Sequence, residues 1–163
     1  MATETERKFL LRDDSWRREA VSCCLIRQAY ARLEGKPHLN LRVRLMDDQA
    51  FLTLKGPVKD CSRSEFEYPI PPQDADEILK EFCGAGRIEK YRYLIPAGRR
   101  VWEIDEFLGV NAGLVVAEIE LGCPEEPFDH PAWLGREVTS ELRFYNSRLL
   151  EYPYRKWTPE ERI

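Results

Sequence analysis

Near its N-terminus the chain reads Glu4-Thr5-Glu6-Arg7-Lys8-Phe9-Leu10, and its even positions begin with three charged side chains. Side chains alternate between the two faces of a β-strand, so residues two positions apart share a face. In a strand over residues 3–10, Glu4, Glu6 and Lys8 therefore lie together. The stretch predicts a strand with one densely charged face.

Seven further segments have strand character, and turn signals such as Gly35-Lys36-Pro37 and Asp47-Asp48-Gln49 separate them. Helices are predicted over residues 73–83 and 141–151, with a short one over residues 13–20. The Pro-rich stretch 124–131 is predicted to be a loop. The pattern favours an α+β domain built on an antiparallel sheet of about eight strands. The further strands are expected over residues 23–33, 38–46, 50–55, 63–70, 87–95, 100–107 and 113–121.

The later strands repeat the charged face of the first one. The positions between the charged residues are mostly apolar, as in Val115, Ala117 and Ile119. One explanation is a sheet with an ordinary solvated face. The alternative is a closed barrel with apolar faces outside and charged faces lining its lumen. The repeated positions are Arg42 and Arg44, Thr53 and Lys55, Arg63, Glu65 and Glu67, Lys90 and Arg92, Glu103 and Asp105, and Glu118 and Glu120.

The clustered charges of such a lumen would need ligands of opposite charge. Two carboxylates about 4 Å apart repel by roughly 4 kcal/mol at an effective dielectric constant near 20. Oxygen-only ligand sets favour Mg²⁺ or Mn²⁺ over zinc. The clustered Lys and Arg side chains would in turn need an anion, and a phosphate chain supplies one.

Composition limits the other classes of function. A length of 163 residues suits one domain over residues 1–163. The net charge of −4 argues against general binding to nucleic acid or to an anionic membrane. The sequence has no apolar run of transmembrane or signal-peptide length, so a cytoplasmic location is expected. The five cysteines, without C-x-x-C spacing, argue against a disulfide framework and a zinc site.

Taken in order, the motifs resemble those of the CYTH superfamily, also called triphosphate tunnel metalloenzymes. The resemblance covers residues 3 to about 150 and begins with the E-x-E-x-K opening. One departure is Gln28-Ala29-Tyr30-Ala31, where the family has Q-G-Y-L. The other matching motifs are Leu41-Arg42-Val43-Arg44, Leu52-Thr53-Leu54-Lys55-Gly56, Arg63-Ser64-Glu65-Phe66-Glu67-Tyr68, Glu89-Lys90-Tyr91-Arg92-Tyr93, Trp102-Glu103-Ile104-Asp105, Ala117-Glu118-Ile119-Glu120 and Glu137-Val138-Thr139.

The resemblance implies an eight-stranded antiparallel β-barrel that forms a tunnel for triphosphates, with a few peripheral helices. It implies that Lys90 and Tyr30 act as a pair that activates water. The implied metal ligands are Glu4, Glu6, Asp105, Glu118 and Glu120. The implied phosphate-binding residues are Lys8, Arg42, Arg44, Lys55, Arg63 and Arg92.

The motifs look most like the bacterial inorganic triphosphatases, which cleave tripolyphosphate to pyrophosphate and phosphate. A class IV adenylyl cyclase, a thiamine triphosphatase and a non-catalytic polyphosphate- or nucleotide-binding module stay open as alternatives. The simplest alternative is a structural β-protein whose charged faces are solvated. The expected partner is a small triphosphate, not nucleic acid or membrane. The oligomeric state, a homodimer included, and the roles of Glu65, Glu67, Cys23 and Cys24 stay open.

Overall fold

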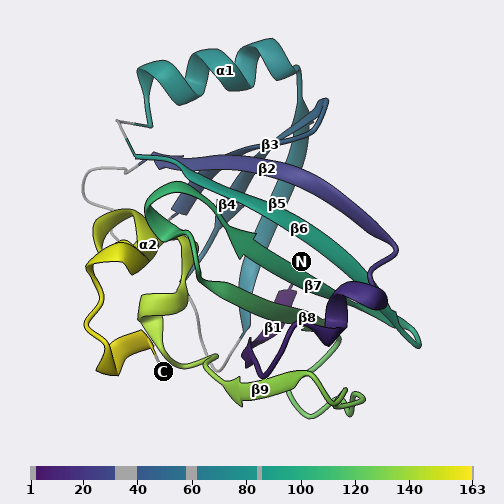
Figure 1. The fold of residues 1–163 in the computed structure, drawn as a ribbon. Coiled ribbons are helices and arrows are strands. Elements are labelled where there is room, and N and C mark those ends of the chain that lie inside the picture. The colour runs from purple at the N-terminus through teal and green to yellow at the C-terminus, as the bar shows by residue number, and fades with distance from the viewer. Residues whose placement is uncertain (1–2, 32–39, 58–61, 84–85, 163) are drawn as a thin grey trace.

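The computed structural model describes residues 3–31, 40–57, 62–83 and 86–162 (Figure 1). The α-helices within these residues are α1 (Pro72–Glu81) and α2 (Asn146–Glu151). Short 3₁₀ turns are η1 (Ser15–Arg18), η2 (Gly109–Asn111), η3 (Leu142–Phe144), η4 (Tyr154–Lys156) and η5 (Glu160–Arg162). The strands are β1 (Thr3–Leu11), β2 (Ser22–Ala31), β3 (Asn40–Met46), β4 (Gln49–Lys55), β5 (Ser62–Ile70), β6 (Ile88–Ala97), β7 (Arg100–Phe107), β8 (Val115–Leu121) and β9 (Leu134–Glu137).

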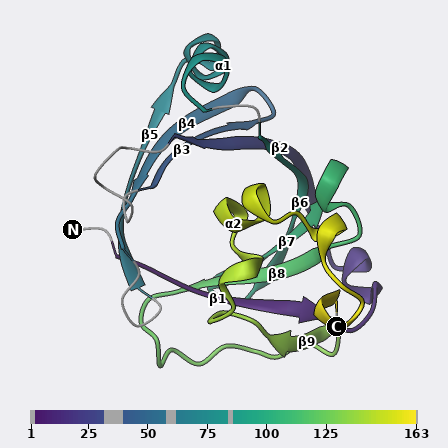
Figure 2. The same cartoon turned by 90° about the vertical axis from the view of Figure 1, so that its left-hand side faces the viewer.

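The strands of the described residues form one antiparallel sheet in the order β5-β4-β3-β2-β6-β7-β8-β1-β9. β5 also pairs with β1, where Thr3 lies opposite Ser64 and Thr5 opposite Ser62. Figure 2 shows the sheet curling round so that β5 comes back beside β1. The predicted antiparallel sheet with peripheral helices is confirmed, while the closed eight-stranded barrel stays a prediction.

The sheet has one strand more than the sequence suggested. β9 follows the predicted Pro-rich loop and pairs with the second half of β1, where Leu134 lies opposite Leu11. A Cβ atom on Gly135 would lie 2.7 Å from the carbonyl oxygen of Leu10, so glycine permits this close approach. A strand of four residues carries too short an alternation to be recognised in the sequence.

The predicted turn at Asp47-Asp48-Gln49 joins β3 to β4. Asp47 adopts a left-handed φ of 52°, which Asp tolerates better than most residues. Its side-chain oxygen Oδ1 accepts a hydrogen bond of 3.1 Å from the Leu25 backbone N–H, which ties the turn to β2. The other predicted turn, Gly35-Lys36-Pro37, lies outside the described residues.

The helices match the predictions unequally. α1 begins with Pro72, whose missing N–H is tolerated in the first turn, and it ends one residue before Phe82. The expected helix over residues 13–20 is only the turn η1. The expected helix over residues 141–151 is divided into η3 and α2, because Tyr145 has an extended ψ of 136°.

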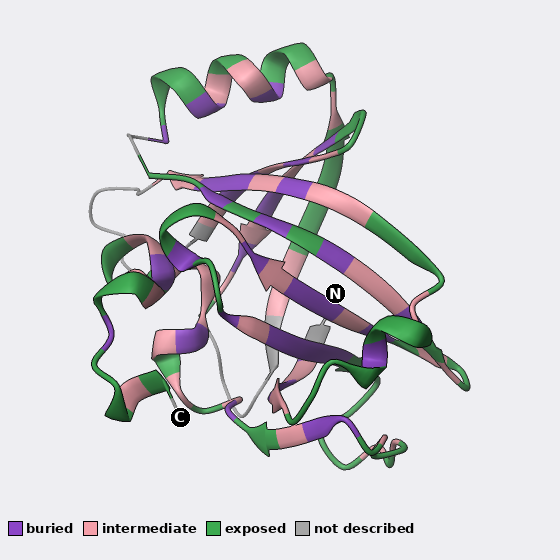
Figure 3. Cartoon of the chain, in the orientation of Figure 1, coloured by how far each residue is buried: buried purple, intermediate pink, exposed green. Residues whose placement is uncertain are grey.

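The buried apolar side chains of the described residues form three clusters, and two of them pack the outer side of the curled sheet. Ala75 and Leu79 of α1 pack with Val43 and Ala50 from β3 and β4. A second cluster, which includes Phe144 and Trp157 from the C-terminal segment, lies on the charged side of the sheet, because its member Phe107 stands opposite Lys90 in register. The third includes Phe9, Trp16, Trp102, Ile119 and Trp133. Figure 3 shows buried bands along β7 and β8.

Burial of the two outer clusters places the charged faces together on the inner side of the curled sheet. No helix within the described ranges is long and apolar enough to cross a membrane.

Candidate active site

The strand registers bring the predicted charged positions onto one continuous face. Residues directly opposite each other on neighbouring antiparallel strands share a face. Glu4 and Arg63 are opposite in register, although their side chains lie outside the described part of the structure. The other opposed pairs are Glu6 with Glu120, Lys8 with Glu118, Glu103 with Glu118, Arg92 with Asp105, Tyr30 with Arg42, Arg42 with Thr53, Thr53 with Glu67, and Lys55 with Glu65.

One group of charges, the acidic-strand cluster, gathers on β1, β6, β7 and β8. Lys8 Nζ lies 2.7 Å from Glu118 Oε1, and both side chains are almost fully buried. Arg92 donates to the other Glu118 oxygen over 3.1 Å and also pairs with Glu103. The cluster consists of Lys8, Lys90, Arg92, Glu103, Asp105 and Glu118.

Asp105 pairs with two cations of this cluster, Lys90 and Arg92. It is completely buried, and Arg92 donates to both of its oxygens, Nε to Oδ1 and Nη2 to Oδ2, each over 2.7 Å. Lys90 Nζ also contacts Oδ2. A buried carboxylate is tolerated only when it is paired in this way. Asp105 therefore binds cations of the protein itself, and its assignment as a metal ligand stays a prediction.

The two buried lysines of the cluster differ in their electrostatics. Burial lowers the pKa of Lys8, but the carboxylates of Glu118 and Glu6 outweigh it and hold the pKa above its ordinary value. For Lys90, burial is the largest influence and Arg92 adds to it, so the pKa falls to about 8 although Asp105 opposes the change. Lys90 is thus the lysine able to lose its proton near neutral pH.

A second group, the basic-strand cluster, lies on β3, β4 and β5. Glu67 Oε2 accepts from Arg42 and Arg44 over 3.0 Å each, and from the Thr53 hydroxyl over 2.8 Å. Lys55 Nζ pairs with Glu65 over 2.6 Å. Glu65 and Glu67, whose roles the sequence left open, therefore balance the positive charges of the basic-strand cluster. These cations are the ones that the sequence predicts to bind the substrate.

The guanidinium of Arg44 has a hydrogen-bond donor without an acceptor among the described residues. Its Nε is buried and finds no hydrogen-bond partner among the described residues. Burial and the neighbouring Arg42 both lower the pKa of Arg44, so the guanidinium lacks full compensation. A buried donor without an acceptor costs about 1–3 kcal/mol, which a bound phosphate oxygen would recover.

Tyr30 and Lys90 occupy different levels of the charged face. Lys90 lies opposite Ile26 on β2, and Tyr30 is four residues further along that strand. The backbones of Ile26 and Tyr30 are therefore roughly 13 Å apart along the strand. The Tyr30 hydroxyl accepts from Gln28 Nε2 over 2.8 Å. Lys90 Nζ is directed to Asp105 and, over 3.4 Å, to Asn146. The predicted pairing of Lys90 with Tyr30 stays a prediction.

The remaining predicted metal ligands lie at the junction of β1 and β8. Glu6 is half-buried and stands opposite the exposed Glu120. Directly opposed carboxylates are unfavourable without a cation, and their oxygens suit Mg²⁺ or Mn²⁺. The residues therefore fit such an ion. Among the described residues, no three His, Cys, Asp or Glu side chains converge into a ready-made metal site, and the Glu4 side chain is not among them.

Comparisons with known proteins agree with this geometry. Residues 2–149 match the model of the CYTH domain. The chain belongs to the CYTH family. An inorganic triphosphatase of Acetivibrio thermocellus is 42% identical over 157 residues, 96% of this chain and 99% of that protein. An inorganic triphosphatase of Nitrosomonas europaea is 32% identical over 151 residues, 90% of this chain and 96% of that protein.

Solved structures share the fold of this chain. The crystal structure of an inorganic triphosphatase superposes with a TM-score of 0.62 at 30% identity, covering 92% of this chain and 95% of that chain. A protein from Pyrococcus horikoshii gives a TM-score of 0.59 at 21% identity, covering 75% and 80% of the two chains.

Several residues of this CYTH chain join the charged face without having been predicted as site residues. Glu103 was noted in sequence only as a charged neighbour of Asp105, and Thr53 only as a partner of Lys55. Asn146 carried no sequence signal, because α2 reaches Lys90 from a distant part of the chain. Figures 1 and 2 together show α2 across one end of the curled sheet.

Proposed function

We propose that this CYTH chain is an inorganic triphosphatase that hydrolyses tripolyphosphate to pyrophosphate and phosphate. The observation that carries the proposal is the 42% identity, over almost the whole chain, to a protein named inorganic triphosphatase. The buried cations Lys8, Arg42 and Arg92 on one face support it, because a small polyanion is the ligand that such a face attracts.

The proposed fold is one CYTH domain over residues 1–163, with β1 to β8 forming a closed barrel around the charged face. The pairing of β5 with β1 supports closure, and β9 would lie outside the ring. We further propose a cytoplasmic enzyme that acts on a small molecule and not on nucleic acid. A homodimer stays an option for its assembly.

The proposed phosphate-binding residues act by charge and by position. Arginine side chains present forked donors to phosphate oxygens, and lysines act as point charges. The acidic partners hold these cations in place before substrate arrives, which reduces the reorganisation needed in the transition state. The proposed set is Lys8, Arg42, Arg44, Lys55, Arg63 and Arg92.

The proposed metal is Mg²⁺ or Mn²⁺, held by carboxylates of β1, β7 and β8. When bound, it would supply positive charge to phosphate oxygens and acidify water. Glu6 and Glu120 are supported by their opposed positions, whereas Asp105 and Glu118 are supported only by their place on the same face. The proposed ligands are Glu4, Glu6, Asp105, Glu118 and Glu120.

Lys90 is the proposed general base, assisted by Tyr30. A neutral Lys90 Nζ can accept a proton from the attacking water, and its pKa of about 8 leaves a useful neutral fraction near neutral pH. Tyr30 shares the face with Lys90 and would orient water or phosphate through its hydroxyl.

A substrate panel with purified protein tests this proposal. Tripolyphosphate, ATP, thiamine triphosphate and pyrophosphate are each supplied with Mg²⁺ or Mn²⁺, and with a chelator as the control. Rapid release of phosphate from tripolyphosphate alone, dependent on metal, is the expected result. Cyclic AMP from ATP, preference for thiamine triphosphate, or tight binding without product would each overturn it in favour of the corresponding alternative.

A further inference from the structure

A segment near the C-terminus contacts both buried lysines of the acidic-strand cluster. Lys8 lies on β1 and Lys90 on β6, and the strands β7 and β8 separate these two in the sheet. The backbone carbonyl of Phe144 accepts from Lys8 Nζ over 3.4 Å. Two residues later, Asn146 Oδ1 accepts from Lys90 Nζ over 3.4 Å. Residues 144–146 therefore connect two lysines that the sheet itself holds on different strands.

The break between η3 and α2 makes this double contact possible. Tyr145 lies at the break with an extended ψ of 136°, and Asn146 is the first residue of α2. In a helix that continued through Tyr145, the Phe144 carbonyl would accept from the backbone N–H four residues further on. The break leaves this carbonyl to Lys8.

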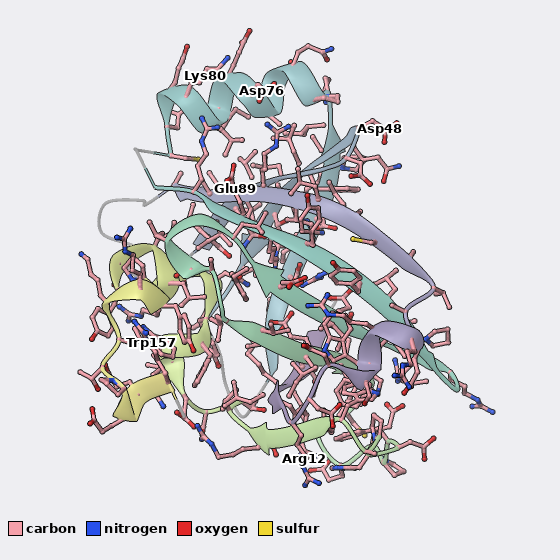
Figure 4. All side chains as sticks on the ribbon, in the orientation of Figure 1. Arg12, Asp48, Asp76, Lys80, Glu89 and Trp157 are labelled. Atoms are coloured by element: carbon pink, nitrogen blue, oxygen red, sulfur yellow. The ribbon has the colours of Figure 1, made fainter. Side chains whose placement is uncertain are left out.

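The segment is anchored by the apolar cluster around it. The ring of Phe144 packs edge-to-face against Trp157, with ring centroids 5.0 Å apart, and Leu149 of α2 is completely buried. Figure 4 labels Trp157 among the side chains of the C-terminal segment. A segment that is packed in this way can hold other side chains in place.

The ring of Tyr145 lies beside the ammonium group of Lys8. Lys8 Nζ is 5.1 Å from the ring centroid, within the range of a cation–π contact. The Tyr145 hydroxyl donates to the Thr139 carbonyl over 3.1 Å, which fixes the ring. Thr139 Oγ1 accepts from the Lys8 N–H over 3.0 Å, and the Val138 N–H donates to the Lys8 carbonyl over 2.8 Å. The Glu137-Val138-Thr139 motif therefore holds the backbone of Lys8, while Tyr145 holds its side chain.

Asn146 fixes the direction of the Lys90 amine. A lysine nitrogen has three positions besides its bond to Cε. Asp105 Oδ2 occupies one of them and Asn146 Oδ1 a second. The third has no acceptor among the described residues, and the Phe107 ring centroid lies 5.5 Å from Nζ. With two partners fixed, the nitrogen cannot rotate freely, and its third position is available to water or to a phosphate oxygen.

We propose that Tyr145 and Asn146 are positioning residues of the active site, Tyr145 for Lys8 and Asn146 for Lys90. This assignment rests on the proposed function, in which Lys8 binds phosphate and Lys90 accepts a proton from water. The two positioning residues therefore affect different kinetic constants. Loss of the Tyr145 ring weakens substrate binding, whereas loss of the Asn146 amide slows turnover. A general loosening of the C-terminal segment would not produce this difference.

Steady-state kinetics with tripolyphosphate and Mg²⁺ test the proposal. Tyr145→Leu, which removes the ring, is expected to raise KM about fivefold and to leave kcat within about twofold of the wild type. Tyr145→Phe keeps the ring and should restore the wild-type KM. Asn146→Ala is expected to lower kcat about tenfold and to leave KM within about twofold. Ser147→Ala is the matched control on α2, because the Ser147 side chain makes no hydrogen bond with other described residues.

Crystal structures of Tyr145→Leu and Asn146→Ala test the lysine positions without any need for turnover. We expect Lys8 Nζ to be displaced in the first variant and Lys90 Nζ in the second, with thermal unfolding midpoints close to that of the wild type. If Tyr145→Leu fails to fold, Asn146→Ala still decides the proposal.

Three results would overturn the positioning roles. They are unchanged Nζ positions, an equal loss of kcat at constant KM in both variants, and a Tyr145→Phe variant as impaired as Tyr145→Leu. A wild-type protein that does not hydrolyse tripolyphosphate refutes the proposed function instead, and the lysine positions in the crystal structures then decide the positioning roles alone.

Discussion

Lys8 Nζ lies 2.7 Å from Glu118 Oε1, and the two side chains are only 3% and 10% exposed. Sequence-based reasoning gave these residues separate tasks, phosphate binding for Lys8 and metal binding for Glu118. In the structure each is the other's partner, so substrate and metal would have to compete with an internal ion pair. Burial raises the pKa of Glu118, but the positive charges of Lys8, Lys90 and Arg92 lower it by more. The net pKa is below its ordinary value, and the carboxylate stays ionised.

Removing Lys8 is expected to destabilise the fold. In Lys8→Met the buried Glu118 loses one of its two cationic partners, and the free energy of unfolding in urea falls by about 3 kcal/mol at pH 7. Adding Glu118→Gln should restore part of the loss, since no charge is then left without its partner. Arg148→Gln, which breaks an exposed pair with Glu151, is the control and should leave stability nearly unchanged.

Arg44→Ala is expected to raise the KM for tripolyphosphate about tenfold and to lower kcat much less. The reason is its guanidinium, whose buried Nε lacks a partner among the described residues. Arg27→Ala provides the comparison, because Arg27 lies on the opposite face of the neighbouring strand β2. Steady-state kinetics measure both constants, and an unchanged KM in Arg44→Ala would count against phosphate binding.

Glu120→Gln is expected to abolish metal-dependent turnover without unfolding the protein. Glu120 is exposed and stands opposite Glu6, so its loss removes a proposed metal ligand and little packing. Turnover is measured across a Mg²⁺ and Mn²⁺ titration, with the thermal unfolding midpoint as a check on folding. Glu125→Gln, in an exposed loop, should behave like the wild type. Normal activity of Glu120→Gln at saturating metal would refute the assignment.

The pH dependence of kcat/KM distinguishes two roles for Lys90. Burial lowers its pKa to about 8, so the neutral form grows as pH rises through that value. A general base is active when neutral, and kcat/KM should therefore rise between pH 7 and 9, as measured at constant metal. Lys90→Arg should lose this rise, because arginine stays protonated. A fall through pH 8 would show instead that the charged form of Lys90 binds phosphate.

Much of the fold was accessible from local sequence. The alternation in β1, β7 and β8 was recognised because a strand places every second residue on one face, whatever the rest of the chain does. The failures fall where local signals are short or conflicting. β9 has only four residues, and the helix expected over residues 141–151 is interrupted at Tyr145.

The sequence by itself determined that charged side chains share strand faces and that their motifs are those of the CYTH family. The tertiary structure decided which charges meet. Asp105 pairs with Lys90 and Arg92 because β6 and β7 are paired in one particular register. Asn146 reaches Lys90 because the C-terminal segment packs against the sheet. Strand register and the docking of distant segments depend on long-range burial of apolar surface, which periodicity within a single segment does not encode.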